Sequence, residues 1–229
     1  MKILAIDTSS TVAAVAVSED GVLLGEYTVN HGLTHSQRLL PMVEELLGSL
    51  SMKISEIDLF ACSTGPGSFT GLRIGIATVK GFAFAENKPC VSVSGLEAMA
   101  YNHLYTDYII CPLMDARAGQ VYNALYKRTR GGIKTLTPPR AVEIDKVIEE
   151  LSAMKDKVLF LGDGVAPNLE KIKKLGSRSV LGAFNNNMQR AASIALAAEI
   201  KAKNGEILTC DRLEAEYLRK SQAEREAGR

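Results

Sequence analysis

The run Asp7-Thr8-Ser9-Ser10 carries side chains that could do chemistry, and it directly follows a short apolar stretch. A carboxylate at such a turn can hold magnesium through water, and backbone N–H groups in a turn can cradle phosphates. Asp7, Thr8, Ser9 and Ser10 are therefore candidates for a nucleotide- or phosphate-facing turn. The structural alternative is that the hydroxyls satisfy the turn backbone while Asp7 caps a neighbouring helix.

The segment from Gly65 to Gly75 is the densest glycine-rich signal in the chain. It is not a P-loop, because Gly71 is followed by Leu72 where that motif has Lys, and its spacing does not match G-x-G-x-x-G. A glycine loop that leads into a helix N-terminus can still bind an anion.

A second interpretation of this segment is steric. Gly67, Gly71 and Gly75 recur every four residues and would line one face of a helix. Each glycine costs about 0.5–1 kcal/mol relative to alanine in a helix, and close approach of another helix would offset that cost. We therefore predict a dimer or partner interface at these glycines, to which we also assign Arg73 and Thr78. Replacing Gly71 or Gly75 with Leu should then block dimerisation and leave the fold intact.

A third candidate is Gly162-Asp163-Gly164, which stands between an apolar run and a helical pattern. These residues could approach the adenosine of a nucleotide, or they could form a plain strand-to-helix turn. The turn from Asp115 to Gly119 would correspond to the Asp7 turn, but it offers Arg117 and no pair of hydroxyls.

The three histidines do not assemble a catalytic or metal set by spacing. His31 and His35 are four residues apart, but no H-E-x-x-H pattern is present, so a loop and helix-start role is favoured. His103 stands alone. The chain has no G-x-S-x-G elbow, which leaves a hydrolase interpretation without a nucleophile.

The elements that must position these residues follow from hydrophobic periodicity. The first half of the chain predicts strands at 2–6, 12–17, 22–29, 59–62 and 89–93. It predicts helices at about 36–50, with a kink or restart at Pro41, and at 70–85 and 95–103. The second half predicts strands at 108–113, 121–126 and 158–161, and helices at 144–154, 167–175 and 188–203.

This order predicts a duplicated β-β-β-α-β-α-β-α unit in an α/β protein with two lobes. Lobes of this kind, each opened by a hairpin whose turn carries an Asp, are typical of the actin-like ATPase fold of Hsp70 and the sugar kinases (ASKHA), with mixed five-stranded sheets. The turns of the two lobes could face one another across a cleft. We expect the N-terminal lobe to span 1–103 and the smaller C-terminal lobe 104–210. The segment 211–229 is expected to pack back on the first lobe or to end as a frayed tail.

Composition excludes several classes of protein. The chain has 229 residues, 46% of them hydrophobic and 23% charged, which is ordinary for a globular protein and unlike a disordered or disulfide-rich one. The net charge of +1 argues against a chain held to nucleic acid by its bulk charge. The four cysteines lie far apart, and neither a signal peptide nor a membrane span is expected, so we predict a cytoplasmic protein with reduced thiols.

Five motifs in order resemble the TsaB family, also called YeaZ, and the resemblance extends from Met1 to about Arg225. They are Ile3 to Ser9, Gly65 to Gly75, Ser94 to Ala100, Met114 to Arg117 and Tyr217 to Arg219. The family implies an actin-like fold and a role in making threonylcarbamoyladenosine next to the anticodon of tRNA.

The resemblance also implies a non-catalytic role. The related transferase TsaD binds metal through a pair of histidines, and the corresponding places here are Gly95 and Met99. We therefore expect a scaffold or activator subunit of a tRNA threonylcarbamoyltransferase complex, which is not an enzyme on its own and has no metal or catalytic residues. TsaD and TsaE are the expected partners, with a homodimer when the chain is alone and tRNA contacted through the complex. No cofactor is expected to be required, although weak ATP/ADP-Mg binding or a nucleotide shared at the partner interface is compatible with the fold.

Two other functions compete with this expectation. An ATP-dependent small-molecule kinase or ATPase of the same fold is suggested by the hairpin turns, although little chain remains for a substrate lid. A protease is suggested by an older label of the related family, although the sequence shows no nucleophile–base pair and no zinc set.

Overall fold

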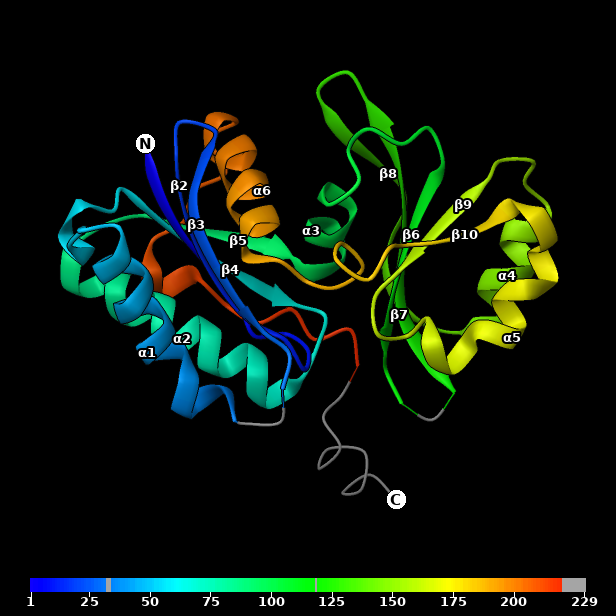
Figure 1. Ribbon diagram of the computed structural model, residues 1–229, viewed down its shortest axis with the longest axis horizontal. Coiled ribbons are helices and arrows are strands. Elements are labelled where there is room, and N and C mark those ends of the chain that lie inside the picture. The colour runs from blue at the N-terminus through cyan, green and yellow to red at the C-terminus, as the bar shows by residue number, and fades with distance from the viewer. Residues whose placement is uncertain (32–33, 118, 220–229) are drawn as a thin grey trace. The chain divides into compact units, whose positions relative to one another are not determined.

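The computed structural model describes residues 1–31, 34–117 and 119–219 of the chain (Figure 1). These residues form two compact units. The first unit contains Met1–Ala98 and returns for Gln189–Glu216, and the second contains Met99–Met188 and, of the described residues that follow, 217–219. Of the C-terminal segment 211–229, residues 220–229 lie outside the described residues.

The first unit is built on a five-stranded mixed sheet in the order β3-β2-β1-β4-β5. Its strands are β1 (Lys2–Asp7), β2 (Ala13–Glu19), β3 (Val22–Val29), β4 (Leu59–Gly65) and β5 (Cys90–Ser94). β1, β2 and β3 are antiparallel neighbours, whereas β4 runs parallel to β1 and β5 parallel to β4. The carboxyl ends of β1, β4 and β5 therefore meet at one edge of the sheet, where the Asp7 turn and the glycine loop follow.

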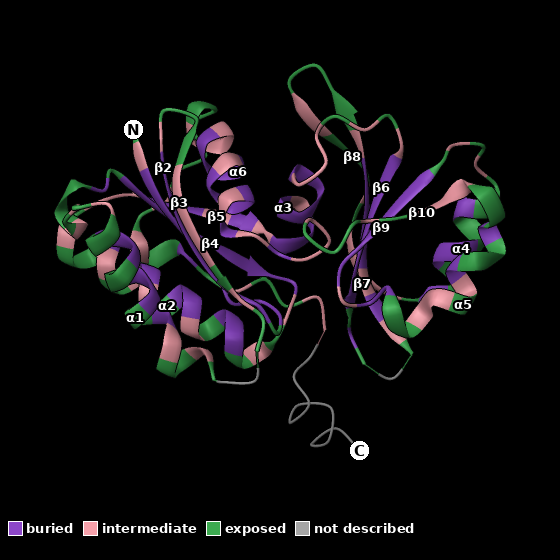
Figure 2. Ribbon diagram, in the orientation of Figure 1, coloured by how far each residue is buried: buried purple, intermediate pink, exposed green. Residues whose placement is uncertain are grey.

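Helices cover both faces of this sheet (Figure 1). On one face lie α1 (His35–Ser49) and α2 (Phe69–Glu86), and on the other lies α6 (Ala191–Lys203). α1 buries Leu39, Met42, Val43, Leu46 and Leu47 along one face, as an amphipathic helix does, whereas Leu40 is exposed. It runs through Pro41 as one helix, so the predicted restart is absent. Figure 2 shows the buried side of these helices turned toward the sheet.

The second unit repeats the plan with a sheet in the order β10-β9-β6-β7-β8. Its strands are β6 (Ile109–Asp115), β7 (Gln120–Thr129), β8 (Gly132–Glu143), β9 (Val158–Leu161) and β10 (Ser179–Leu181). The helices are α4 (Ile144–Ser152) and the single turn α5 (Leu169–Ile172), while the short α3 (Gly95–Tyr101) connects β5 to this unit. The mixed five-stranded sheets and the β-β-β-α-β order predicted from the sequence are thus confirmed.

Two strands of the second sheet were not predicted. β8 contains Pro138 and Pro139, which cannot donate ladder hydrogen bonds, and it forms the edge of the sheet, where proline is tolerated. β10 has only three residues and forms the opposite edge. The helix predicted at 167–175 is broken into 3₁₀ turns around α5, and the residue Gly176 has a positive φ.

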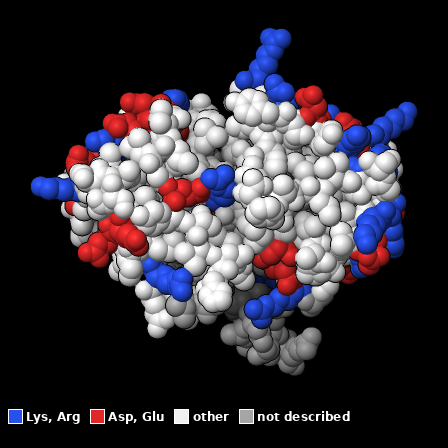
Figure 3. All heavy atoms as spheres, in the orientation of Figure 1, with Lys and Arg blue, Asp and Glu red and all other residues white. Residues whose placement is uncertain are grey.

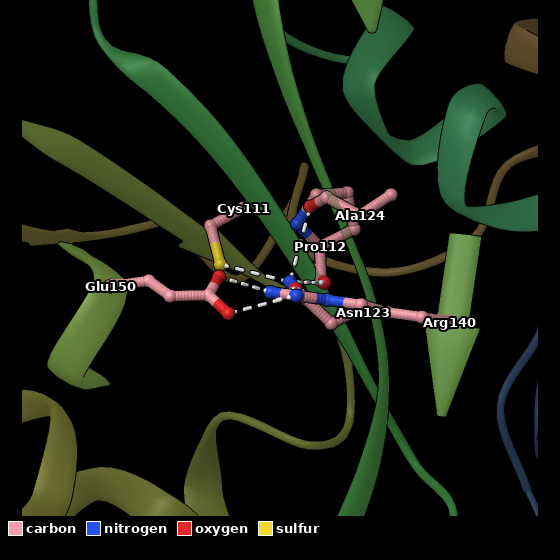
Figure 4. A network of polar contacts seen from close by, with 6 residues as sticks. All are labelled: Cys111, Pro112, Asn123, Ala124, Arg140 and Glu150. Carbon is pink, nitrogen blue, oxygen red and sulfur yellow. Dashed lines mark hydrogen bonds and ion pairs between the residues drawn. The ribbon is translucent and has the colours of Figure 1, made fainter. Parts of the chain in front are cut away.

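A buried polar network ties the second unit together (Figure 4). The side-chain Nδ2 of Asn123, on β7, donates to Cys111 Sγ and to the carbonyls of Pro112 and Ala124. Its Oδ1 accepts from the guanidinium of Arg140 on β8, which also makes a two-point ion pair with Glu150 on α4. Because every polar group of Asn123 is engaged, we assign this network a structural role.

The division of the chain differs from the predicted lobes 1–103 and 104–210. The helix predicted at 188–203 is α6, which packs on the first sheet and does not belong to the second unit. Its alanine-rich surface lets it lie close to β1 and β2. The segment 211–216 lies against the first unit, where Lys80 Nζ donates to Asp211 O and Glu216 N donates to Thr64 O.

Two general features of the described residues bear on function. Cys62, Cys90 and Cys111 are buried free thiols, and burial raises the pKa of Cys90 to about 11 and those of the other two still further. Such thiols hold little thiolate at neutral pH. Among these residues, we find no helix with the length and apolar character that a membrane crossing requires.

Candidate functional site

The Asp7 turn of the first unit is closed on itself by hydrogen bonds. Asp7 Oδ1 accepts from Ser9 N at 2.8 Å and from Ser9 Oγ at 2.7 Å. Ser10 Oγ donates to Gln189 Oε1 at 2.9 Å and accepts from Val12 N at 3.1 Å. The hydroxyls of Ser9 and Ser10 thus satisfy groups of the chain itself, as the structural alternative for this turn predicts.

The glycine loop and the start of α2 clamp this turn. Ser68 N donates to Ser9 O at 2.7 Å, and Thr8 Oγ1 donates to Gly71 O at 2.8 Å. A Cβ at Gly67 would lie 2.2 Å from Ser9 O, and a Cβ at Gly71 would lie 2.1 Å from Thr8 O. The glycines therefore leave room for the carbonyl groups of Thr8 and Ser9. These carbonyls occupy the space at the start of α2 where a bound anion would have to lie.

The prediction that Gly67, Gly71 and Gly75 form a dimer face is wrong. Gly71 and Gly75 are buried, and a Cβ at Gly75 would lie 2.5 Å from Thr8 Oγ1. The close approach that offsets the cost of these glycines is made by the chain's own β1–β2 turn, not by a second helix. Arg73 is exposed on the outer side of α2, with its guanidinium over the Phe69 ring, and Thr78 is half-buried, so these two remain predictions for a partner contact.

Unpartnered buried atoms surround the carboxyl ends of the first sheet. Three buried side-chain oxygens near the ends of β1, β4 and β5 have no hydrogen-bond partner: Asp7 Oδ2, Ser63 Oγ and Ser94 Oγ. Burial raises the pKa of Asp7, against the opposing effects of the Ser9 hydrogen bonds and of His35. His35 itself makes a 2.7 Å contact from Nε2 to Ser10 O. Asp7 is thus a buried carboxyl at the base of the turn, poorly placed to hold a hydrated magnesium ion.

The phosphate and metal roles that the fold family suggests do not fit these residues. The hydroxyls and the Ser68 amide that would cradle a phosphate are already engaged within the turn. A Cβ at Gly95 would lie 2.9 Å from Ser63 Oγ, so a larger side chain has no room there, and Met99 is buried. In the part of the chain that the structure describes, no three His, Cys, Asp or Glu side chains could jointly hold a metal ion.

The Gly162-Asp163-Gly164 segment of the second unit is a tight turn after β9. A Cβ at Gly162, where φ is +95°, would lie 2.3 Å from Leu113 O, and Gly164 N donates to that same carbonyl at 3.0 Å. Asp163 Oδ1 accepts from Asp115 N at 3.0 Å, and burial raises the pKa of Asp163. The segment thus packs β9 against the end of β6, in agreement with the strand-to-helix alternative.

Two more residues acquire roles that their spacing did not predict. Arg219, in the C-terminal Tyr-Leu-Arg motif, donates to the carbonyl of Ala116 in the β6–β7 turn. His103 contacts Asn186 O through Nε2 at 3.1 Å, and burial lowers its pKa. Tertiary contacts of this kind leave no trace in local sequence spacing.

Comparisons with known proteins match a TsaD family model and proteins named TsaB or YeaZ. The model of the TsaD family, described as tRNA N6-adenosine threonylcarbamoyltransferase, matches residues 31–226. The tRNA threonylcarbamoyladenosine biosynthesis protein TsaB of Bacillus subtilis is 32% identical over 98% of this chain and 96% of its own length. The structure of YeaZ from Pseudomonas aeruginosa is 28% identical with a TM-score of 0.82, over 95% of this chain and 99% of that one.

A more distant structure shows the fold alone. Component A of the (R)-2-hydroxyglutaryl-CoA dehydratase of Acidaminococcus fermentans has a TM-score of 0.52 at 15% identity, covering 89% of this chain and 99% of its own. The likeness extends over both units, each of which carries the mixed five-stranded sheet that was predicted from the sequence.

Proposed function

The chain belongs to the TsaB family, also called YeaZ, and on that premise we propose that it is a non-catalytic scaffold or activator subunit for threonylcarbamoyladenosine modification of tRNA. The modification itself follows from the family. The subunit role, in which the transferase TsaD carries out the chemistry, is supported by the state of the candidate site.

One observation carries the proposal. The turn that would face a nucleotide has its hydroxyls and the adjoining helix amide committed to hydrogen bonds within the chain. An enzyme of this fold needs those groups for its substrate. Gly95 and Met99 stand where the resemblance puts metal-binding histidines, which also supports a non-catalytic role. The kinase or ATPase alternative therefore gains no support, and we propose that the chain requires no cofactor.

Reconstitution tests the subunit role. In a mixture of TsaD, TsaE, threonylcarbamoyl-adenylate and unmodified tRNA, we expect the rate of tRNA modification to fall at least about tenfold when this chain is omitted. A tenfold fall corresponds to an activation free energy higher by about 1.4 kcal/mol. The chain alone, with the same substrates, should give no product. Full modification without the chain, or turnover by the chain alone, would contradict the proposal. ATP with magnesium in a calorimeter serves as the control for the kinase alternative, which requires micromolar binding with phosphate release.

We propose that the outer face of α2 contacts TsaD, and a second copy of this chain when TsaD is absent. The exposed residues of α2 recur at helical spacing and include Thr70, Arg73, Ala77, Gly81 and Phe84. Phe84 is 79% exposed, which is costly for a phenyl ring in water. Small residues along the same stripe would let a partner helix approach closely. TsaE is proposed as a further member of the complex, which acts in the cytoplasm, where tRNA is modified.

A substitution on this stripe tests the contact. Ala77→Arg should convert a dimer to a monomer in sedimentation velocity and prevent co-purification with TsaD, because the added side chain separates the packed helices. Ala183→Arg makes the same change at an exposed alanine of the second unit and should leave both assemblies intact. A wild-type chain that stays monomeric would refute the homodimer, and Ala77→Arg that still binds TsaD would refute the shared surface.

A further inference from the structure

Basic side chains gather at one end of the sheet in the second unit. The register places Ile109 beside Val158 and Ile110 opposite Tyr126, so the β7–β8 turn, the loop before β6 and the loop before β9 lie at the same end of the sheet (Figure 1). We call this surface the basic end. Its Lys and Arg residues, exposed or half-exposed, are Lys127, Arg128, Arg130, Lys134, Lys155 and Lys157.

Only part of this charge is balanced within the chain. Lys127 Nζ lies 2.7 Å from Asp156 Oδ1, and Arg128 Nη1 lies 3.5 Å from Asp107 Oδ1, both at exposed positions. Arg130 and Lys134 make no ion pair with any carboxylate among the described residues. Because the whole chain carries a net charge of only +1, this is a local concentration of positive charge. Figure 3 shows Lys and Arg side chains projecting over the tip of the β7–β8 hairpin.

Two lysines face each other across the β7–β8 hairpin, and their repulsion lowers its stability. Lys127 and Lys134 are directly opposite partners in the antiparallel ladder. Like charges in such a pair destabilise a hairpin by roughly 0.2–1 kcal/mol. A bound polyanion would turn this repulsion into favourable contacts.

An exposed aromatic ring lies in the loop before β6, at the same end of the sheet. Tyr105 is 90% exposed, in the loop whose Asp107 holds Arg128. An exposed ring and unpaired cations on one surface are the combination that single-stranded nucleic acids use, with phosphates on the cations and a base stacked on the ring. An acidic protein surface would use the cations but would not need a ring that is almost completely exposed.

We propose that the basic end binds the phosphate backbone of RNA, with Tyr105 as a stacking surface for an unpaired base. The identity of that RNA as tRNA rests on the proposed function. The inference goes beyond that function, because it gives this chain a direct contact with the tRNA that the family resemblance assigns to the complex as a whole.

The test is binding of an unmodified tRNA transcript to the full chain by fluorescence anisotropy, between about 20 and about 200 mM salt. The wild-type affinity should fall linearly with salt on logarithmic axes. Arg130→Glu and Lys134→Glu together should weaken binding at least about tenfold at low salt and reduce the slope by about 1.4–1.8, the value for two lost phosphate contacts. Tyr105→Ala should weaken binding of unpaired RNA more than binding of duplex RNA.

A matched control variant distinguishes RNA binding at the basic end from a general effect of the protein's charge on RNA binding. Lys146→Glu makes the same charge change as Lys134→Glu at an exposed residue of α4, outside the basic end, and should change the affinity less than twofold. Lys134→Glu should not lower the unfolding midpoint, because it places opposite charges across the ladder at Lys127.

Three outcomes would overturn the proposal. They are no saturable binding by the wild type at low salt, equal losses for Lys134→Glu and Lys146→Glu, and loss of TsaD co-purification by the basic-end variants with RNA binding unchanged. The last outcome would assign the surface to an acidic protein partner. None of them depends on the reconstitution assay, so failure of the RNA contact and failure of the proposed function remain distinguishable.

Discussion

Gly71→Ala is expected to unfold much of the protein at room temperature or to lower its free energy of unfolding by about 3 kcal/mol or more. The single added methyl group would lie 2.1 Å from Thr8 O and 3.3 Å from Ser68 Cβ. The carbonyl belongs to the turn after a central strand, and that turn is held by the hydrogen bonds of Thr8 and Ser9. Since the backbone cannot yield without breaking them, the cost should reach or exceed the roughly 1–3 kcal/mol usual for overpacking.

A glycine in open space provides the control. Gly48→Ala, in α1, places a methyl group where no atom lies within 4 Å and should raise the free energy of unfolding by about 0.5–1 kcal/mol. Chemical denaturation of the two variants and the wild type measures both effects. A Gly71→Ala protein as stable as the wild type would contradict the packing of α2 on the Asp7 turn. Gly71→Leu should behave worse still, which replaces the earlier expectation of a folded monomer.

Asp7→Asn is expected to stabilise the fold at neutral pH by about 1–3 kcal/mol, the usual cost of leaving a buried polar group unsatisfied. Asp7 Oδ2 is buried without a partner, and so are Ser63 Oγ and Ser94 Oγ at the ends of the neighbouring strands. An amide keeps the oxygen that accepts from Ser9 and puts an N–H donor in place of the unpaired oxygen. The substitution also removes a carboxyl whose charged form is disfavoured by burial.

The pH dependence of this effect has a definite sign. Because burial raises the pKa of Asp7, the folded chain favours the protonated carboxyl, and the full benefit is present below the ordinary pKa of about 3.8. As the pH rises from there through the raised pKa of the folded chain, the wild type loses stability relative to Asp7→Asn. The two unfolding free energies should therefore converge near pH 3 and diverge toward pH 7. His35, the nearby titratable group named above, is common to both proteins.

Asp156→Asn should show the opposite sign, because the hydrogen bond from Lys127 lowers the pKa of this exposed carboxyl. Its contribution is present above the unfolded pKa and is lost as the pH falls. If Asp7→Asn were destabilising at pH 7, the Ser9 hydrogen bonds and His35 would have to outweigh the effect of burial on Asp7.

Much of the fold followed from local patterns. β3 and β9 have the bounds that periodicity predicts, and α1 forms where a helix was expected. β8 and β10 escaped prediction because edge strands depend on one neighbour only, so prolines and short length remove the usual signal. α6 was assigned to the wrong lobe because its helical character is local, whereas the sheet on which it packs depends on contacts with β1 and β2, far away in the sequence.

The candidate site divides in the same way. The types and spacing of Asp7 to Ser10 and of the glycines at 67, 71 and 75 were enough to mark both segments and to indicate the family. Only the fold decided which part of the chain packs against these glycines. A four-residue spacing predicts a helix face without side chains, but it does not predict the segment that packs on that face. The amino-acid sequence determined which groups are present and on which side of a helix or strand they lie. Only the tertiary structure decided that the Asp7 turn and the start of α2 hydrogen-bond to each other. The reason is that parallel pairing of β1, β4 and β5 brings the ends of these strands together.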